Sequence, residues 1–222
     1  MEAIVVDTGP NPAWAVIWLH GLGADGTDFE SVVPELGLPE TPAVRFIFPH
    51  APYQPVTCNG GYVMRAWYDI ISLARDSREI DEAGLIASRQ RVRSLIASEE
   101  ARGIPAQRII LAGFSQGGAV AYLTGLTHPE RLGGIVALST YIPSPRLLRA
   151  ELVAEQLEVP VFAAHGDEDD VVAPELGEAA RDLLRQLGAA PEWRSYPMPH
   201  SVCLEEIRDL GLWLSLRLKN TA

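Results

Sequence analysis

Short apolar runs alternate along the chain with longer amphipathic segments. An uninterrupted apolar run, rich in branched or aromatic residues, is typical of a strand that is covered on both faces of a sheet. The predicted strands are residues 13–19, 44–48, 108–112, 134–138, 159–163 and a shorter one at 192–196. The predicted helices are residues 28–36, 79–102, 116–127, 145–156, 174–187 and 202–218. This alternation predicts an α/β fold with a mostly parallel central sheet and helices on both faces.

Residues 49–67 form a connection that is rich in Pro and Gly and too long for an ordinary turn. Long connections without secondary structure in compact domains tend to carry function, so we interpret this one as a loop that forms part of a binding site. The sequence contains no internal repeat and no stretch suited to a separate cap domain. We therefore expect a single domain over residues 1–222.

Charge and composition exclude several classes of partner. The 222 residues include 18 Lys and Arg against 29 Asp and Glu, a formal net charge of −11. Phosphate backbones and anionic lipid surfaces repel such a protein, so we expect no nucleic-acid partner and no stable membrane association. Only 2 Cys occur, which excludes a disulfide scaffold. Neither an export signal nor a bilayer-length apolar run is visible, so the predicted location is cytoplasmic.

The strongest chemical motif is a serine between a predicted strand and a predicted helix. The strand runs directly into Gly113-Phe114-Ser115-Gln116-Gly117. This matches G-x-S-x-G in the strand-turn-helix context of a nucleophile elbow, where the turn is so sharp that only glycine fits two positions either side of the serine. The turn projects the Ser115 hydroxyl at the carboxyl edge of the sheet, and the N–H of Gln116 is then placed to stabilise an oxyanion.

A serine hydroxyl is a weak nucleophile until a general base accepts its proton. Of the 5 His in the chain, only His165 and His200 come late enough for the order serine, acid, histidine. His165 ends an apolar run and is interpreted as a structural histidine. His200 lies in a proline-rich loop before the last predicted helix, and we predict that it is the base. Cys203 lies nearby but outside any elbow and is interpreted as a structural thiol.

The acid that orients the histidine is expected after the strand at 159–163. Asp167, Glu168, Asp169 and Asp170 are adjacent there, and they cannot all face one imidazole. Glu168 is disfavoured by its longer side chain. Spacing alone does not choose among the three aspartates.

Several motifs together resemble one known family. They are Leu19-His20-Gly21-Leu22-Gly23-Ala24-Asp25-Gly26, Pro49-His50-Ala51-Pro52 with Pro55-Val56-Thr57 and Asn59-Gly60-Gly61, Gly113-Phe114-Ser115-Gln116-Gly117-Gly118, His165-Gly166 with Asp169 and Val171-Val172, and Tyr196-Pro197-Met198 before His200. In this order the sequence resembles the carboxylesterase and acyl-protein thioesterase family, especially its bacterial carboxylesterases, over essentially the whole chain. The resemblance implies an α/β-hydrolase fold without a cap domain.

The resemblance also implies roles for individual residues. The acid of the family lands on Asp169, so the implied catalytic triad is Ser115, Asp169 and His200. The family assigns the second oxyanion donor to the N–H of Leu22, beside that of Gln116. No metal and no cofactor are implied.

The implied substrate site includes Met64 and Trp67 as acyl-binding residues. The sequence departs from the family where Arg65-Ala66 replaces the usual Pro-Ser and where Pro199 replaces a frequent Gly. An uncapped site predicts an open groove, and hence a serine esterase for short- to medium-chain carboxylic esters. The alternative within the same chemistry is an acyl-protein thioesterase or lysophospholipase for longer acyl groups. A non-catalytic binding module has no need of a strained serine, and a homodimer is left open.

Overall fold

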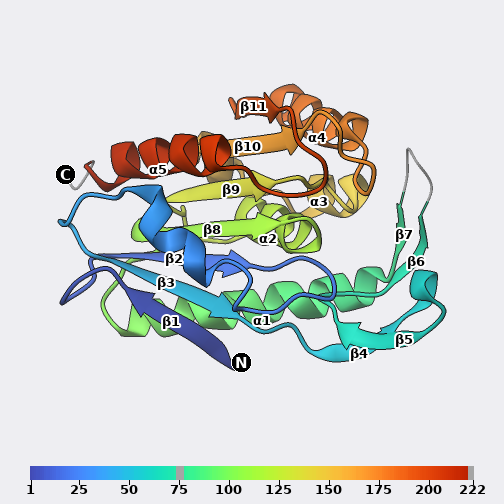
Figure 1. The fold of residues 1–222 in the computed structure, drawn as a ribbon, viewed down its shortest axis with the longest axis horizontal. Helices are drawn as coiled ribbons and strands as arrows, with labels where there is room; N and C mark the ends of the chain where they lie inside the picture. Colours follow the sequence, from blue (N-terminus) through green and yellow to red (C-terminus); the bar gives the residue numbers. More distant parts are fainter. Residues whose placement is uncertain (74–77, 220–222) are drawn as a thin grey trace.

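A seven-stranded sheet forms the centre of the molecule (Figure 1). The computed structural model describes residues 1–73 and 78–219. The strand order is β1-β3-β2-β8-β9-β10-β11, and every neighbouring pair is parallel except β1 with β3. The strands are β1 Ala3–Asp7, β2 Trp14–Leu19, β3 Val44–Pro49, β8 Ile109–Phe114, β9 Gly134–Leu138, β10 Val161–Gly166 and β11 Glu192–Tyr196. The prediction of a mostly parallel sheet is confirmed.

Alternate residues of the central strands belong to separate hydrophobic cores on the two faces. On β2, Val16 and Trp18 pack in the core that also contains Trp213 of the last helix, whereas Ala15 and Ile17 pack in the opposite core. Every residue of β2 is buried. Coverage on both faces is the physical reason why the strands read as uninterrupted apolar runs.

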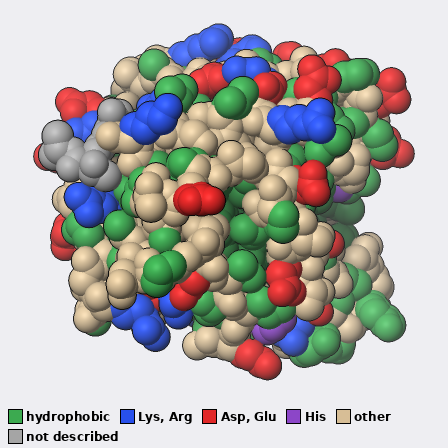
Figure 2. Space-filling view, turned by 60° about the vertical axis from the view of Figure 1, so that its left-hand side comes forward, with side chains coloured by type: hydrophobic (Ala, Val, Ile, Leu, Met, Phe, Trp, Pro, Cys, Tyr) green, Lys and Arg blue, Asp and Glu red, His purple; other side chains and the backbone are tan. Residues whose placement is uncertain are grey.

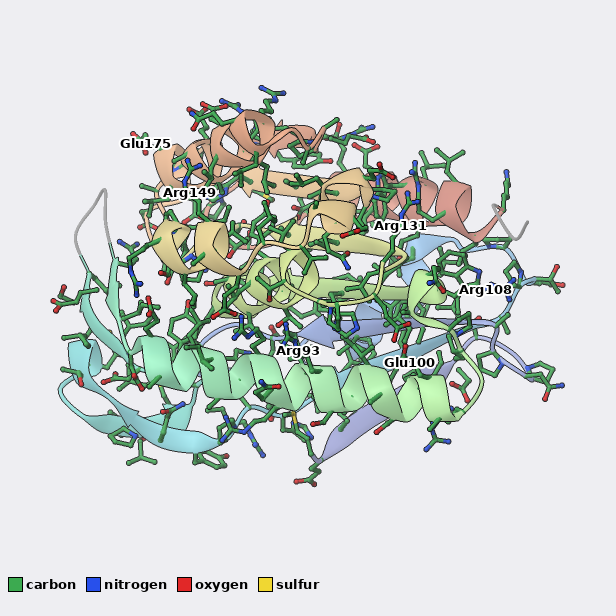
Figure 3. All side chains as sticks on the ribbon, turned by 180° about the vertical axis from the view of Figure 1, so that it is seen from behind. Arg93, Glu100, Arg108, Arg131, Arg149 and Glu175 are labelled. Carbon is green, nitrogen blue, oxygen red and sulfur yellow. The ribbon has the colours of Figure 1, made fainter. Side chains whose placement is uncertain are left out.

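The helices lie in two layers around this sheet (Figures 1 and 3). The α-helices of the described residues are α1 Glu82–Ala101, α2 Gln116–Leu126, α3 Pro145–Glu151, α4 Pro174–Leu187 and α5 Leu204–Leu218. Helices α1 to α4 cover one face, and α5 covers the other together with a short 3₁₀ helix, Glu30–Leu36. In Figure 3, Arg93 extends from α1 toward the end of α2, where its guanidinium donates to the Thr127 carbonyl oxygen.

Two small hairpins project beyond the carboxyl ends of the parallel strands (Figure 1). One consists of β4 Tyr53–Val56 and β5 Tyr62–Arg65, and the other of β6 Ile70–Leu73 and β7 Arg78–Ile80. The prediction that residues 49–67 are a loop without secondary structure is therefore wrong. Their Pro and Gly content suggested an irregular loop, but the structure has a short antiparallel pair of strands there whose side chains are mostly exposed or half-buried.

Some predicted helix boundaries also need correction. The predicted helix over residues 28–36 is a 3₁₀ helix that contains Pro34, which cannot donate an α-helical hydrogen bond. The predicted helix over residues 79–102 begins only at Glu82, because Asp81 caps its first turn by accepting from the Ala83 N–H.

Two further differences concern an interrupted helix and an edge strand. The predicted helix over residues 145–156 is divided into α3 and a 3₁₀ helix at Ala154–Glu158. The edge strand β1 was not predicted, because its residues are half-buried or exposed and form no long apolar run. An edge strand is held by backbone hydrogen bonds to its single neighbouring strand, so its side chains need not be apolar.

Glu206 is a buried carboxyl group in the first turn of α5. Its relative exposure is 0%, and neither side-chain oxygen has a hydrogen-bond partner among the described residues. Burial raises the pKa of Glu206 to about 8, because removal from water penalises the charged form. The folded protein therefore holds this carboxyl protonated at neutral pH.

Replacing Glu206 with glutamine is expected to flatten the dependence of stability on pH. The unfolded chain releases the Glu206 proton near its ordinary pKa and the folded chain only near 8, so the stability of the wild type falls as pH rises between these values. Relative to Glu206→Gln, the wild-type free energy of unfolding should fall by about 5 kcal/mol across this window. Urea titrations measure it, with the exposed neighbour in Glu205→Gln as control. Parallel pH profiles for wild type and Glu206→Gln would contradict the prediction.

Candidate active site

Ser115 occupies the turn between β8 and α2 with φ 53° and ψ −121°. This backbone conformation is strained for a residue with a side chain. A Cβ atom added to Gly113 would lie 2.4 Å from the Gly117 carbonyl carbon, and one added to Gly117 would lie 2.3 Å from the Leu19 carbonyl oxygen. Both positions therefore require glycine, which is the steric reason for the G-x-S-x-G pattern.

A chain of hydrogen bonds joins Ser115, His200 and Asp169, the candidate triad. The His200 Nε2 atom lies 2.9 Å from the Ser115 Oγ atom. The His200 Nδ1 atom lies 2.7 Å from the Asp169 Oδ2 atom. Because an ionised carboxylate only accepts, the imidazole proton belongs on Nδ1, and Nε2 is left to accept the serine proton. The arrangement therefore supplies a hydroxyl, a base directed at it and an acid that fixes the tautomer of the base.

Both carboxylate oxygens of Asp169 accept hydrogen bonds. Its Oδ1 atom accepts from the N–H groups of Val171 at 2.9 Å and Val172 at 2.7 Å. Burial by itself raises the pKa of Asp169, but hydrogen bonds from His165 and His200 outweigh it and hold the pKa well below its usual range. The carboxylate is therefore ionised and fixed in one orientation.

The sheet brings the acid and the histidine together because β10 and β11 are parallel neighbours. Gly166 at the end of β10 is paired with Tyr196 at the end of β11, so the loops that follow both strands meet at one edge. A Cβ atom on Gly166 would lie 2.2 Å from the Met198 carbonyl oxygen, so this close approach requires glycine. Asp167 and Asp170 are exposed at the surface of the same loop, and neither faces His200.

His165 lies against the acid, a contact that the sequence analysis missed. Its Nε2 atom is 2.8 Å from the Val172 carbonyl oxygen and 3.4 Å from the Asp169 Oδ2 atom. A carbonyl oxygen only accepts, so the proton of His165 lies on Nε2. His165 is buried and takes no part in the candidate triad, but it supports the loop that carries the acid. Its position four residues before Asp169 was the available signal.

The two predicted oxyanion donors lie at the same edge of the sheet. The N–H of Gln116 opens α2 directly after the serine. A Cβ atom on Gly21 would lie 3.6 Å from the Ser115 Cβ atom, so the loop that carries Leu22 approaches the nucleophile closely. Among the described residues, the N–H groups of Leu22 and Gln116 donate to no loop carbonyl and to no side chain. Both are therefore unpaired in the described part of the chain, as the prediction requires.

A groove of about 320 Å³ opens beside Ser115 and His200. Its apolar lining is formed by Leu22, Ile70, Leu73, Phe114, Tyr141, Val171 and Val172, and its polar lining includes Asp28, Asn59 and Arg78. A neighbouring hollow of about 800 Å³ shares Leu73, Arg78 and Val171 with this groove. The Arg78 guanidinium donates to the Val171 carbonyl oxygen, which ties the β6–β7 hairpin to the loop of the acid.

Neither of the two residues predicted to bind the acyl group lines this groove. Trp67 has a relative exposure of 0% and packs in the core beneath α1, so its large apolar ring serves packing. Met64 lies half-buried on β5, facing the Gly23 loop. The groove is lined instead by Ile70 and Leu73 of the other hairpin. Sequence reasoning missed them because the sequence pattern of an apolar residue on a hairpin does not differ between a side chain that faces a core and one that faces a groove.

Residues 1–73 and 78–219 contain neither a candidate metal cluster nor a candidate membrane span. No cluster of three or more His, Cys, Asp or Glu side chains is arranged to hold a metal ion in this part of the chain. No helix there combines the length and apolarity needed to cross a bilayer.

A mostly parallel sheet with a serine on a strained strand-to-helix turn, and a histidine and a carboxylate on later loops of the same edge, defines an α/β-hydrolase. The sequence matches the Phospholipase/Carboxylesterase family over residues 1–218. The chain belongs to this family, and it is a serine hydrolase.

Named relatives fall into two groups of hydrolase. Acyl-protein thioesterase 1 of Mycosarcoma maydis is 40% identical over 230 residues, which cover 96% of each chain. Carboxylesterase SOBER1 of Arabidopsis thaliana is 33% identical, with coverage of 93% of this chain and 92% of the relative. The crystal structure of Zea mays acyl-protein thioesterase 2 superposes with a TM-score of 0.87 at 29% identity, covering 98% of this chain and 99% of that one. Both ester and thioester hydrolysis are therefore represented among its relatives.

Proposed function

We propose that the protein is a serine carboxylesterase that hydrolyses short- to medium-chain carboxylic esters through a covalent acyl-enzyme. The observation that carries this proposal is the hydrogen-bonded chain from Ser115 through His200 to Asp169, with the serine facing an apolar groove. A buried, ionised acid, a correctly protonated base and a strained nucleophile serve no purpose in passive binding.

Acylation begins when His200 Nε2 accepts the proton of Ser115 Oγ as the oxygen attacks the ester carbonyl carbon. The bond to the alcohol then breaks, and His200 returns the proton to the leaving oxygen. Asp169 stabilises the imidazolium that exists between these steps. The product is an acyl group on Ser115 and a free alcohol.

Deacylation repeats these steps with water. His200 accepts a proton from water, the resulting hydroxide attacks the acyl carbon, and Ser115 leaves as the protonated hydroxyl. In both halves, negative charge develops on the former carbonyl oxygen. The free N–H groups of Leu22 and Gln116 are the proposed donors to that oxygen. The reaction needs only water besides the ester, and no metal or cofactor.

The size and polarity of the groove support short and medium acyl groups. A volume of about 320 Å³ with largely apolar walls suits a modest acyl chain. The net charge of −11 disfavours anionic lipid aggregates as substrate. On the face seen in Figure 2, acidic and basic side chains lie among one another, which matches a small soluble ester better than a charged polymer. Free Cys58 and Cys203 fit the cytoplasmic location that we propose.

An acyl-protein thioesterase is the second candidate, and a separate observation favours it. The groove shares Leu73, Arg78 and Val171 with a neighbouring hollow of about 800 Å³. Carboxylates of Asp167, Asp170 and Glu175 also line this hollow, but its size leaves room for a longer acyl chain. The relative from Mycosarcoma maydis is named for thioester hydrolysis. Both candidates use the same triad, so the distinction lies in the substrate alone.

The distinction is measured by kcat/KM on p-nitrophenyl esters from acetate to palmitate, beside an S-acylated peptide. We expect the maximum of kcat/KM at butyrate to octanoate and a value lower by about tenfold or more for palmitate. Methylene groups that extend beyond a small groove add no further binding energy. A maximum at palmitate with efficient peptide deacylation would favour the thioesterase.

The nucleophile is tested by covalent labelling. We expect a fluorophosphonate probe to modify the folded protein at Ser115 and no other serine, and prior incubation with EDTA to leave the rate of labelling unchanged. Mass spectrometry of the digested adduct identifies the site. Heat-denatured protein is the control, since labelling there would report intrinsic reactivity rather than the assembled site. Folded protein without an adduct at Ser115 would refute the proposed function.

A further inference from the structure

Trp67 lies between the two loops that carry the proposed oxyanion donors, and it is bonded to both. Its indole Nε1–H donates to the His20 carbonyl oxygen at 2.9 Å. Its backbone N–H donates to the Gln116 Oε1 atom at 2.8 Å. Leu22 follows His20 by two residues, and Gln116 is itself the other donor.

The side chain of Gln116 strengthens this connection from the other side. Its Nε2–H donates to the Tyr68 carbonyl oxygen at 2.7 Å, so the amide is bonded to the backbone of both residue 67 and residue 68. Both members of the pair are buried, where a hydrogen bond is shielded from water and its loss is costly. The start of α2 is therefore bonded once to the Trp67 backbone and once to the Tyr68 backbone.

The His20 segment is fixed just as firmly. The His20 ring packs against the Trp67 indole with 5.3 Å between ring centroids. Its Nε2 atom accepts from the Ala51 N–H at 3.0 Å, so its proton lies on Nδ1, 2.7 Å from the Gly21 carbonyl oxygen. Burial lowers the pKa of His20 to about 4, so the ring stays neutral and this pattern persists across the neutral range.

We propose that Trp67 is a positioning residue that sets the spacing between the two oxyanion donors, Leu22 and Gln116. Oxyanion stabilisation depends on donors placed for the tetrahedral oxygen before it forms. One buried residue holds them at that spacing, because its indole is bonded to the His20 loop and its backbone N–H to Gln116. The inference rests on the proposed function, because it assumes that these N–H groups serve an oxyanion.

The test is Trp67→Phe with Trp18→Phe as its matched control. Both tryptophans are almost completely buried, so both substitutions remove the same atoms from a core. The Trp18 indole N–H has no hydrogen-bond partner among the described residues, whereas that of Trp67 holds His20. A difference between the two variants therefore isolates the hydrogen bond from the lost packing.

We expect Trp67→Phe to lower kcat by about tenfold with little change in KM, since the lost interaction acts in the transition state. The affinity for a trifluoromethyl ketone, which forms a tetrahedral oxyanion on the serine, should fall by a similar factor. The dependence of kcat/KM on pH should keep its shape, because the base and acid are untouched. Trp18→Phe should lose less than twofold in kcat and in ketone affinity, although we expect thermal unfolding to show that both variants are destabilised.

A second pair of measurements keeps the proposal falsifiable if Trp67→Phe folds poorly. Gln116→Glu retains an acceptor for the Trp67 N–H but loses the donor to the Tyr68 carbonyl oxygen, and we expect it to reduce kcat and ketone affinity together. The proposal is overturned if either variant raises KM alone, or if Trp67→Phe and Trp18→Phe lose equal activity. Wild-type protein without esterase turnover or a Ser115 adduct would instead refute the proposed function.

Discussion

Replacing Ser115 with alanine is expected to lower kcat by about 10⁶-fold, and His200→Ala by a similar factor, because members of a triad act as a unit. Without the hydroxyl there is no acyl-enzyme, and without the imidazole the hydroxyl keeps its proton. The 2.9 Å contact between Ser115 Oγ and His200 Nε2 is the path of proton transfer, so neither group supports catalysis without the other. Hydrolysis of p-nitrophenyl butyrate, followed to very low rates, measures the effect.

The double variant Ser115→Ala/His200→Ala provides the sharpest control. It should be no slower than either single variant, whereas independent contributions would multiply. Cys203 is a partly buried thiol at the start of α5, and Cys203→Ala should leave kcat within a factor of about two. Appreciable turnover by Ser115→Ala that disappears on adding Cys203→Ala would identify the thiol as the nucleophile and contradict the assignment.

Replacing Asp169 with asparagine is expected to lower kcat by about 10⁴-fold, by analogy with serine proteases. The amide can donate to His200 Nδ1, which then loses its proton and leaves Nε2 protonated and unable to act as a base. The variant also loses a carboxylate whose pKa is lowered by folding. Such a carboxylate stabilises the folded state at pH values above the ordinary pKa of aspartate. Activity and thermal unfolding measured in parallel at neutral pH separate the two effects.

Asp170→Asn is the matched control for this substitution. Asp170 carries the same charge one residue later but is exposed and does not contact His200. We expect its kcat to remain within a factor of about two of the wild type, as for most surface substitutions. A nearly silent Asp169→Asn beside a crippled Asp170→Asn would show that the acid is wrongly assigned.

The central strands could be predicted because strands buried on both faces consist almost entirely of apolar residues. Residues such as Val16 and Trp18 face opposite ways from Ala15 and Ile17, and both sets must be apolar where helices cover both faces. The two hairpins and the edge strand β1 carry exposed side chains and leave no such pattern. These were the elements that sequence reasoning missed.

The elbow and the base could likewise be recognised locally. Gly113 and Gly117 report a steric requirement of the turn itself. Chain order leaves only His165 and His200, and the proline-rich loop around His200 distinguishes it from the strand-end His165. The acid could not be chosen by chemistry, because Asp167, Asp169 and Asp170 are chemically identical and adjacent. From the sequence, only the resemblance to a family selects Asp169, whose Oδ2 atom lies 2.7 Å from His200 Nδ1 in the structure.

Trp67 illustrates the opposite limit. The family resemblance implied that its aromatic ring binds the acyl group, but the ring is buried and its indole N–H donates to the His20 carbonyl oxygen. A tryptophan in a cleft and a tryptophan in a core have the same sequence signature. Whether a large apolar side chain faces substrate or core depends on which elements cover it.

By itself, the sequence determined the parallel sheet, the strained serine and the histidine, because these depend on periodicity and on steric rules that act within a few residues. The tertiary structure supplied the physical reason why Asp169 and not its neighbours meets His200, and it alone decided which side chains line the groove and how Trp67 joins the His20 loop to Gln116. Those relations connect residues far apart in the chain. They follow from the pairing of β10 with β11 and the packing of the elbow against the loop after β2, which no local pattern encodes.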